Sequence, residues 1–279
     1  MSALLKIATR IWEHTPSRAL REKYFATYCW LVRGRKLLTT IDGVTLQLDL
    51  SETIDVAVHL RRFEPEIVEA IRSHTRAGDT IFDIGANAGI HALAFAAHAY
   101  PGGKVYAFEP TNYAYARLVE NIRLNPTLAV EAIRLAVSDR NLPPQDVEFR
   151  SSWRTDRIVE RHVSTVEFRS LDDWIRDKGI SSVGVVKIDV DGHEYPVVRG
   201  AAETLKRFLP TIFIEVGLDH FEHQTRDPID FLGRIGYRFW DAKTKRQHSH
   251  QDLRRHLAEC NIDGFTMNVI ASARERFRP

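Results

Sequence analysis

A short apolar segment that runs into a glycine-containing turn, followed by a second segment that ends in one acidic residue, constrains this chain most. Residues 80–84 lead into a turn that holds Gly85 and Gly89, and the segment 104–109 ends about twenty residues later in Glu109. This order of strand, turn, helix and strand is typical of parallel α/β sheets, in which ligands bind at the carboxyl ends of the strands. We therefore expect a nucleoside-cofactor site at that edge.

Each part of this segment has its own physical role. Glycine lacks Cβ, so the backbone can turn tightly and approach a ligand, and the first amides of a helix at 88–100 would point at that ligand. The two acceptor oxygens of Glu109 suit the hydroxyls of a ribose. An acid directly before the turn disfavours a diphosphate and suits an ammonium or sulfonium group. The pattern therefore favours S-adenosylmethionine over a dinucleotide, held by Asp83, Gly85, Asn87, Gly89 and Glu109.

The alternation of strands and helices continues along the chain. We expect strands at 80–84, 104–109, 130–137, 183–190 and 211–216, and helices at 88–100, 112–124, 194–208 and 227–235. A short strand near 238–241, a solvated basic stretch at 243–256 and a final strand at 264–271 would follow. Such alternation implies an α/β fold with a mostly parallel sheet, right-handed crossovers and helices on both faces.

The segment before the first strand has a different character. Residues 1–35 favour helix, 36–50 favour a hairpin that turns at Asp42 and Gly43, and 64–74 favour a helix that starts at Pro65. A further insertion at 139–170 interrupts the alternation. We therefore expect an N-terminal helical and hairpin extension at 1–75, acting as a lid or an oligomerisation element, and an S-adenosylmethionine-binding domain at 76–279.

Composition excludes some classes of partner and compartment. The 279 residues are 44% apolar, and the net charge of +2 comes from balanced acids and bases, so nothing calls for nucleic acid. Cys29 and Cys260 lack the spacing of a zinc site or a disulfide framework, so we expect a reducing, cytoplasmic location.

No apolar run is long enough to span a membrane, and charged residues interrupt the N-terminus too early for a signal peptide. Apolar residues within 1–19 recur at helical spacing. We expect this helix to pack on the domain or on a second subunit of a homodimer. The alternative is peripheral contact with a membrane surface.

A second group of polar side chains follows the predicted strand at 183–190. Asp189, Asp191, His193 and Glu194 fall within six positions, at a strand end that lies beside the first strand in an open sheet. Carboxylates placed so closely repel one another unless a cation, a metal or a raised pKa relieves them. We therefore expect the reaction centre here. The alternative is that Glu194 or Asp191 caps the following helix.

Further polar residues near the predicted edge are weaker candidates. Glu215 ends the fifth strand, so it faces the substrate or anchors a loop. His91 lies one turn into the first helix, where histidine more often packs than reacts. His220 and His223 follow the fifth strand and could face the acceptor. If a divalent metal such as magnesium takes part, its ligands would be Asp189, Asp191 and Glu215.

At these positions the sequence resembles the FkbM family of S-adenosylmethionine-dependent methyltransferases. The resemblance covers about 60–217. Its ordered blocks are Phe63-Glu64-Pro65-Glu66, Gly78-Asp79, Asp83-Ile84-Gly85-Ala86-Asn87-Ala88-Gly89, Val105-Tyr106-Ala107-Phe108-Glu109-Pro110, Asn121-Ile122-x-Leu124-Asn125, Ala136-Val137-Ser138-Asp139, Lys187-Ile188-Asp189-Val190-Asp191-Gly192-x-Glu194 and Gly200-Ala201.

The resemblance implies a class I methyltransferase fold, a Rossmann-like seven-stranded sheet whose last strand is antiparallel. It also implies O-methylation, often of hydroxyls on sugars, polysaccharides, glycolipids or glycosylated natural products. Gly85 and Asn87 would then contact the methionine end of the cofactor, Glu109 its ribose and Asp139 its adenine. Further cofactor contacts are expected from Glu64, Pro110, Ser138 and Asp189.

One departure from the family concerns the reaction itself. Where the family commonly has Glu-Gly-Ala-Glu, this chain has Asp191-Gly192-His193-Glu194. The added imidazole makes His193 the favoured base, while Asp191 stays a candidate.

Two alternatives remain open. Methylation of a nucleic acid is disfavoured because the fourth strand end lacks the Asn/Asp-Pro-Pro-Tyr/Phe motif of base amino-methylating enzymes, although the stretch 243–255 is basic. The other alternative is a protein that binds S-adenosylmethionine without turnover.

Overall fold

The computed structural model describes residues 17–151, 155, 160–217, 227–260 and 266–273. By its internal contacts the chain divides into two compact units, one formed by Met1–Pro65 with Glu148–Val163 and the other by Glu66–Val147 with Ser164–Pro279. Part of the 139–170 insertion thus groups with the N-terminal unit. The role of residues 1–75 as a lid or an oligomerisation element stays a prediction.

The N-terminal unit begins with a helix and a hairpin, as expected. Helix α2 (Arg18–Val32) starts at Ser17, whose side chain accepts a hydrogen bond from the Leu20 amide. Strands β1 (Lys36–Ile41) and β2 (Val44–Asp49) pair antiparallel through the Asp42–Gly43 turn, and helix α3 (Thr53–His59) follows. The predicted hairpin is confirmed, and alternate residues of β2 are buried because they share one face.

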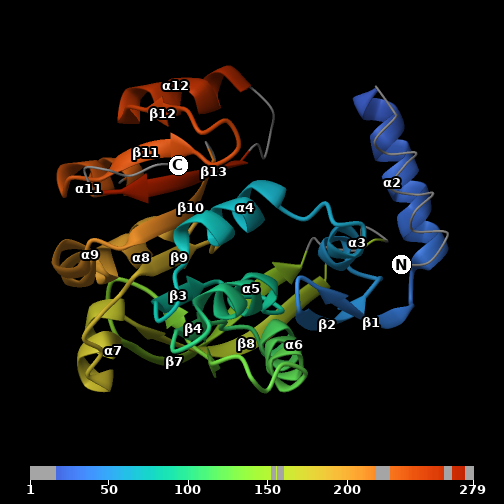
Figure 1. Ribbon diagram of the computed structural model, residues 1–279, viewed down its shortest axis with the longest axis horizontal. Coiled ribbons are helices and arrows are strands. Elements are labelled where there is room, and N and C mark those ends of the chain that lie inside the picture. Colours follow the sequence, from blue (N-terminus) through green and yellow to red (C-terminus); the bar gives the residue numbers. More distant parts are fainter. Residues whose placement is uncertain (1–16, 152–154, 156–159, 218–226, 261–265, 274–279) are drawn as a thin grey trace. The chain divides into compact units, whose positions relative to one another are not determined.

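The larger unit is built on an eight-stranded sheet in the order β12–β11–β13–β10–β9–β3–β4–β5 (Figure 1). The strands are β3 (Thr80–Ile84), β4 (Lys104–Phe108), β5 (Val130–Ile133), β9 (Val185–Ile188), β10 (Thr211–Gly217), β11 (Arg238–Asp241), β12 (Gln247–His248) and β13 (Thr266–Ser272). The strands from β10 to β5 run parallel, and β13 is antiparallel to both β10 and β11. The expected antiparallel last strand is therefore present as β13, but the described residues form eight strands instead of the expected seven, with β12 at the edge.

Helices cover both faces of this sheet. On one face, α4 (Pro65–His74), α5 (Ile90–Ala99) and α6 (Asn112–Arg123) pack against Ile81, Val105, Val185 and Phe213. The other face packs Phe82, Val186 and Ile212 against α7 (Leu171–Lys178), α8 (Glu194–Gly200), α9 (Ala202–Phe208), α11 (Pro228–Arg234) and α12 (His250–Cys260). The central strands are buried on both sides, which explains why they read as continuous apolar runs.

Two expected elements are each divided in the structure. The predicted strand at 130–137 divides into β5 and β6 (Ala136–Val137), and β6 joins β7 (Leu142–Ser151) and β8 (Glu160–Arg169) in a separate three-stranded sheet. The predicted helix at 194–208 divides at Ala201 into α8 and α9. Gly200 ends α8 where a Cβ would lie 1.8 Å from the carbonyl oxygen of Ser138, so the backbones meet there.

The stretch 243–256 is not merely solvated, because it contains β12 and much of α12. The Ser249 hydroxyl accepts from the amide of Asp252 at 3.1 Å, and the same hydroxyl donates to the Asp252 carboxylate at 2.8 Å. Leu253 and Leu257, four residues apart, supply the buried side of the helix. Charged residues hid this short apolar pattern in the sequence.

Candidate functional site

The turn between β3 and α5 is shaped by contacts that only glycine permits. Gly85 has a φ of 83°, and its amide donates to the carbonyl of Phe108 at 3.0 Å. A Cβ on Gly85 would lie 1.8 Å from the carbonyl oxygen of Asp189, and one on Gly89 would lie 2.5 Å from Leu118 Cδ1. The turn therefore holds the ends of β3, β4 and β9 close together without side chains between them.

Glu109 is fixed directly beside this turn. Its Oε2 accepts the Asn87 amide at 3.0 Å, and its Oε1 accepts the amide and the hydroxyl of Thr111 at 2.9 and 2.6 Å. Burial raises the pKa of Glu109, and the hydrogen bonds from Thr111 and Asn87 oppose that rise. Asn87 itself is exposed, with a φ of 47°. A preset carboxylate thus lies next to an open backbone turn.

The four polar side chains at the end of β9 point to different partners instead of forming one cluster. Asp189 lies beside Lys187, and Asp191 is exposed with a left-handed φ of 49°. Glu194 is 1% exposed, and its Oε1 accepts the amide of Gly192 at 3.1 Å. Glu194 therefore holds the turn that precedes α8 and does not cap the helix, whose N-cap residue is His193 with no side-chain cap.

His193 belongs to a separate polar group with Ser138 and Asp139. Its Nε2 is 3.1 Å from Ser138 Oγ, and the Ser138 amide donates to the carbonyl of Arg169 at 2.8 Å. Burial lowers the pKa of His193, and the charge of Asp139 opposes this effect. Asp139 also lies 3.4 Å from the guanidinium of Arg199. The imidazole is therefore neutral at pH 7 and held in one orientation.

The residue that sequence reasoning missed is Lys187, in the middle of β9. Its side chain is 6% exposed, and its Nζ lies 2.9 Å from Asp189 Oδ2 and 3.6 Å from Asp83 Oδ1. Asp83 and Lys187 are paired residues of adjacent parallel strands. The sequence could have indicated this contact. Lys187 lies in an apolar run two positions before Asp189, and alternate residues of a strand share a face. The cation that the carboxylates need is therefore part of the same strand.

The pKa values of this group follow from burial and from the Lys187 charge. Burial raises the pKa of Asp83, although Lys187 opposes the rise. For Asp189, burial also acts upward, but the charge and hydrogen bond of Lys187 and a hydrogen bond with Glu215 outweigh it, so the pKa is lowered. Burial, with a smaller effect of Lys187, lowers the pKa of His91 to about 3. At neutral pH, Asp189 is therefore ionised and His91 is neutral.

The set Asp189, Asp191 and Glu215 is not assembled for a metal in the described part of the chain, where no group of three suitable side chains lies close enough. Lys187 contacts Asp189, while Asp191 is exposed. Glu215, on β10, accepts the hydroxyl of Thr266 at 2.5 Å. Glu215 directly follows Ile214, which pairs with Ile188 at the carboxyl end of β9.

The remaining predicted residues lie in three places. Some are at the carboxyl edge of the sheet, one is in the N-terminal unit, and two are outside the described residues. Pro110 is partly buried directly after Glu109. Glu64 belongs to the N-terminal unit and has a φ of 37°. His220 and His223 lie outside the described residues.

A further polar residue, Asn121, supports the turn from α6. Its side chain is buried and its amide group donates to the carbonyl of Ala88 at 2.8 Å, which ties α6 to the turn.

These residues fit S-adenosylmethionine. Gly85 lets the backbone of Asp189 lie directly against the turn, because a Cβ there would be 1.8 Å from the Asp189 carbonyl oxygen. Glu109 offers carboxylate oxygens, which are what ribose hydroxyls bind. Asp189 offers an ionised and partly exposed carboxylate, which suits a positively charged group.

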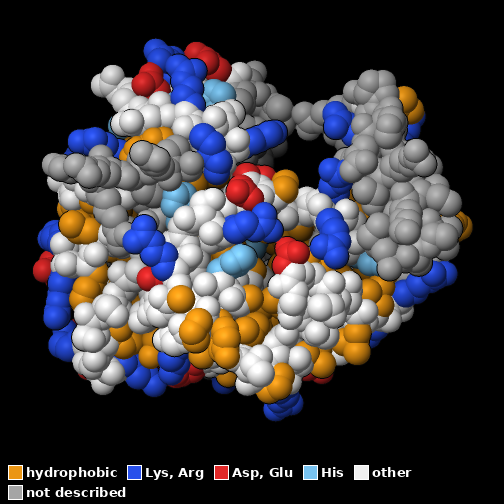
Figure 2. Space-filling view, in the orientation of Figure 1, with side chains coloured by type: hydrophobic (Ala, Val, Ile, Leu, Met, Phe, Trp, Pro, Cys, Tyr) orange, Lys and Arg blue, Asp and Glu red, His pale blue; other side chains and the backbone are white. Residues whose placement is uncertain are grey.

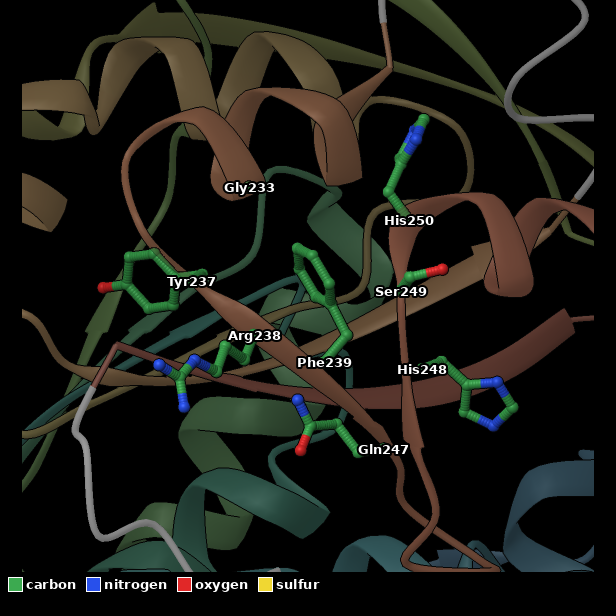
Figure 3. A pocket seen from close by; sticks show the side chains of 8 residues that line it. All are labelled: Gly233, Tyr237, Arg238, Phe239, Gln247, His248, Ser249 and His250. Carbon is green, nitrogen blue, oxygen red and sulfur yellow. The ribbon is translucent and has the colours of Figure 1, made fainter.

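A hollow of about 420 Å³ lies elsewhere on the larger unit, and it is not part of this edge. Phe239 of β11 aligns through Ala271 and Ile212 with Val186, so the hollow lies toward the amino ends of the parallel strands. Figure 3 shows Tyr237 and His248 pointing to opposite sides. The lining residues are Gly233, Tyr237, Arg238, Phe239, Gln247, His248, Ser249 and His250.

Residues 83–262 match the model of the methyltransferase FkbM domain family. The chain is 31% identical over 176 residues to the 2-O-methyltransferase NoeI of Sinorhizobium fredii, covering 54% of this chain and 70% of NoeI. It is 27% identical over 149 residues to the hexuronic acid methyltransferase AglP of Haloferax volcanii, covering 52% of this chain and 59% of AglP. For the 31-O-demethyl-FK506 methyltransferase FkbM of Streptomyces tacrolimicus, identity is 28%, over 46% of this chain and 61% of that protein.

Among solved structures, the chain is similar to methyltransferase FkbM from Methylobacillus flagellatus KT. Sequence identity is 15%, the match covers 78% of this chain and 54% of that one, and the TM-score is 0.44. The assignment of the fold therefore rests on the strand order and direction described above.

Proposed function

Because the chain belongs to the FkbM methyltransferase domain family, we propose that it is an S-adenosylmethionine-dependent O-methyltransferase that acts on a hydroxyl of a sugar, polysaccharide, glycolipid or glycosylated natural product. The observation that carries the proposal is the β3–α5 turn, where Glu109 binds the Asn87 amide beside the backbone cradle at Gly85. The acceptor class is supported by the names of two relatives, a 2-O-methyltransferase and a hexuronic acid methyltransferase.

The residues proposed to hold the cofactor line the carboxyl edge of the sheet. Glu109 would accept the ribose hydroxyls, and Gly85 and Asn87 would contact the methionine end through their backbone. Asp189 would face the positive charge of that end, because it is ionised and partly exposed. Ser138 and Asp139, which follow β6, would lie beside the adenine.

The chemistry requires a hydroxyl oxygen in line with a methyl group. When bound, S-adenosylmethionine supplies that methyl group on a positively charged sulfur. The protein must orient the acceptor, and positioning alone can supply a large part of the rate enhancement. It must also take the hydroxyl proton, because a protonated alcohol is a poor nucleophile.

His193 is proposed as the group that takes this proton. Its pKa lies below the ordinary value because of burial, so the ring is neutral and basic at pH 7. In the tautomer that donates from Nε2 to Ser138 Oγ, Nδ1 carries the free lone pair and accepts the proton. Asp191, which is exposed and lies two residues before His193, is the second candidate for the group that takes the proton.

The test of the function combines binding and turnover. Calorimetry on the purified chain should detect binding of S-adenosylmethionine and S-adenosylhomocysteine. Incubation with sugars, glycolipids and polysaccharides should release S-adenosylhomocysteine, and mass spectrometry should find the added methyl group on a hydroxyl. Binding of nicotinamide nucleotides in the absence of any S-adenosylmethionine binding would overturn the proposal.

The two other functions differ in measurable outcomes. Methyl transfer to an oligonucleotide, weakened by added salt, would support a nucleic acid acceptor. The face seen in Figure 2 carries Lys and Arg side chains at several separate places. Binding without release of S-adenosylhomocysteine from any acceptor would indicate a non-catalytic protein.

Three further aspects of the proposal concern location and assembly. No helix in the described part of the chain is long and apolar enough to cross a membrane. The cytoplasmic location, a homodimer and peripheral membrane contact through residues 1–19 stay predictions, and most of that segment lies outside the described residues.

The participation of a magnesium ion also stays a prediction. Turnover measured with and without a chelator would show whether the reaction needs a divalent metal.

A further inference from the structure

We propose that Lys187 is a positioning residue of the methyltransferase site, and that its ammonium group fixes the carboxylate of Asp189 against the β3–α5 turn. This inference rests on the proposed function. It gives a role to Lys187, a residue of the family block 187–194 for which the sequence predicted none. Lys187 acts through Asp189, because only 6% of its side chain is exposed while 30% of the Asp189 side chain is.

The arrangement orients the ion pair with its anion outward. Lys187 Nζ lies 2.9 Å from Asp189 Oδ2 and 3.6 Å from Asp83 Oδ1, and the Asp83 side chain is fully buried. The interior of the sheet therefore holds the cation and one acid, and the other acid reaches the edge. Of Lys187, Asp83 and Asp189, only Asp189 has a side chain exposed enough to meet a ligand at the edge.

Asp189 is also held by its own backbone. Its amide donates to the carbonyl of Ile84 at 3.1 Å, and its carbonyl oxygen lies where a Cβ of Gly85 would be. The backbone thus places the residue against the turn, and Lys187 sets the direction and charge of its side chain. A carboxylate at this position would attract the ammonium or sulfonium of the donor.

The ammonium group of Lys187 lies between acids of two strands. Asp83 from β3 is fully buried and Asp189 from β9 is partly exposed, and Lys187 Nζ is within 3.6 Å of both carboxylates. His91 from α5 is buried and neutral, so it cannot replace the cation. Removing Lys187 would therefore leave the carboxylate of Asp189 without the cation that holds it.

The experiment is a double-mutant cycle read by calorimetry with S-adenosylmethionine and S-adenosylhomocysteine. Lys187→Met is expected to weaken the affinity for S-adenosylmethionine at least tenfold, and so is Asp189→Asn. The double variant Lys187→Met/Asp189→Asn should bind within twofold of Asp189→Asn, because Lys187 has no carboxylate left to position. Lys187→Arg, which keeps the charge, should recover part of the affinity.

A matched control separates this effect from the general loss of a lysine. Lys206 on α9 forms an exposed ion pair with Glu203 at 3.1 Å. Lys206→Met is expected to leave the affinity unchanged. Thermal unfolding of each variant shows whether it is folded at the temperature of the titration.

The outcomes distinguish this inference from the proposed function. If the unaltered protein binds neither donor nor product, the proposed function fails. If the unaltered protein binds and Lys187→Met stays within twofold of it, or the two single effects add in the double variant, the positioning role is wrong. Should Lys187→Met not fold, the double variant decides, since an affinity more than twofold weaker than that of Asp189→Asn contradicts the inference.

Discussion

Both oxygens of the Glu109 carboxylate accept hydrogen bonds at the carboxyl edge. Replacing it with glutamine turns one acceptor into a donor that faces a backbone amide. Glu109→Gln is therefore expected to weaken S-adenosylmethionine binding by about 1.5–3 kcal/mol, roughly ten- to a hundredfold, as measured by calorimetry. Glu203→Gln, at an exposed site, serves as the control, and equal affinities in the two variants would contradict the role of Glu109.

His193 and Ser138 form the second prediction at this scale. If Nδ1 accepts the proton, His193→Ala should lower kcat about a hundredfold or more and leave the KM for the cofactor nearly unchanged. Ser138→Ala should lower kcat by a smaller factor, because the ring loses the partner that fixes its tautomer. The measurement is initial-rate kinetics with an identified acceptor. His256→Ala, at an exposed position, serves as the control. Undiminished turnover in both His193→Ala and Asp191→Asn would remove this segment from the mechanism.

Among the elements, the β3–α5 turn can be tested by comparing Gly85, which lies in it, with Gly78, which precedes β3 and has nearly the same φ. Gly85 and Gly78 have φ values of 83° and 85°, but a Cβ meets the Asp189 carbonyl only at Gly85. Gly78→Ala should lower the free energy of unfolding by about 1–2 kcal/mol, the strain of a left-handed alanine. Gly85→Ala should lower it by more and should also abolish cofactor binding. Chemical denaturation and calorimetry check both effects, and equal losses in the two variants would show that close approach is unimportant.

The elements also show where sequence reasoning works. Strands β3, β4, β9 and β10 lie close to the predicted positions, because long apolar runs bounded by glycine, proline and charged residues leave few alternatives. Helix α12 was missed because only Leu253 and Leu257 form its buried side. The break between α8 and α9 depends on the contact of Gly200 with the chain at Ser138, which no local pattern contains.

The candidate site was predicted less completely than the fold. Gly85, Asn87 and Glu109 come together as expected, since the ends of adjacent parallel strands meet at one edge. Asp189, His193 and Glu194 are close in sequence yet have different partners, because side-chain direction depends on the packed structure. A lysine is rarely buried without a partner, so Lys187 could be interpreted only after Asp83 and Asp189 were located.

At the scale of the whole molecule, buried neutral histidines couple stability to pH. The pKa of His91 is lowered by burial to about 3, whereas an unfolded chain takes up this proton near 6.5. The unfolded state therefore binds more protons between these values, and the contribution of neutral His91 is complete above pH 6.5 and is lost as the pH falls toward 3. His74, with a pKa lowered to about 4, acts in the same direction.

The measurement compares the unaltered protein with His91→Gln by urea denaturation from pH 7 to pH 4. The difference in free energy of unfolding between the two should change by about 1.4 kcal/mol for each pH unit below 6.5, with the unaltered protein losing more. Carboxylates that do not interact with His91 titrate alike in both proteins and cancel in the difference, whereas Asp189, which interacts with His91, is the exception. Parallel curves for the two proteins would contradict a buried, uncharged His91.

Strand β13 lies between β10 and β11 and is antiparallel to both, although β11 precedes it in the chain. During synthesis, β10 and β11 therefore leave the ribosome without the strand that joins them, and each has an open edge until residues 266–272 appear. The middle of this sheet is therefore completed by a strand that is synthesised after the strands on both of its sides.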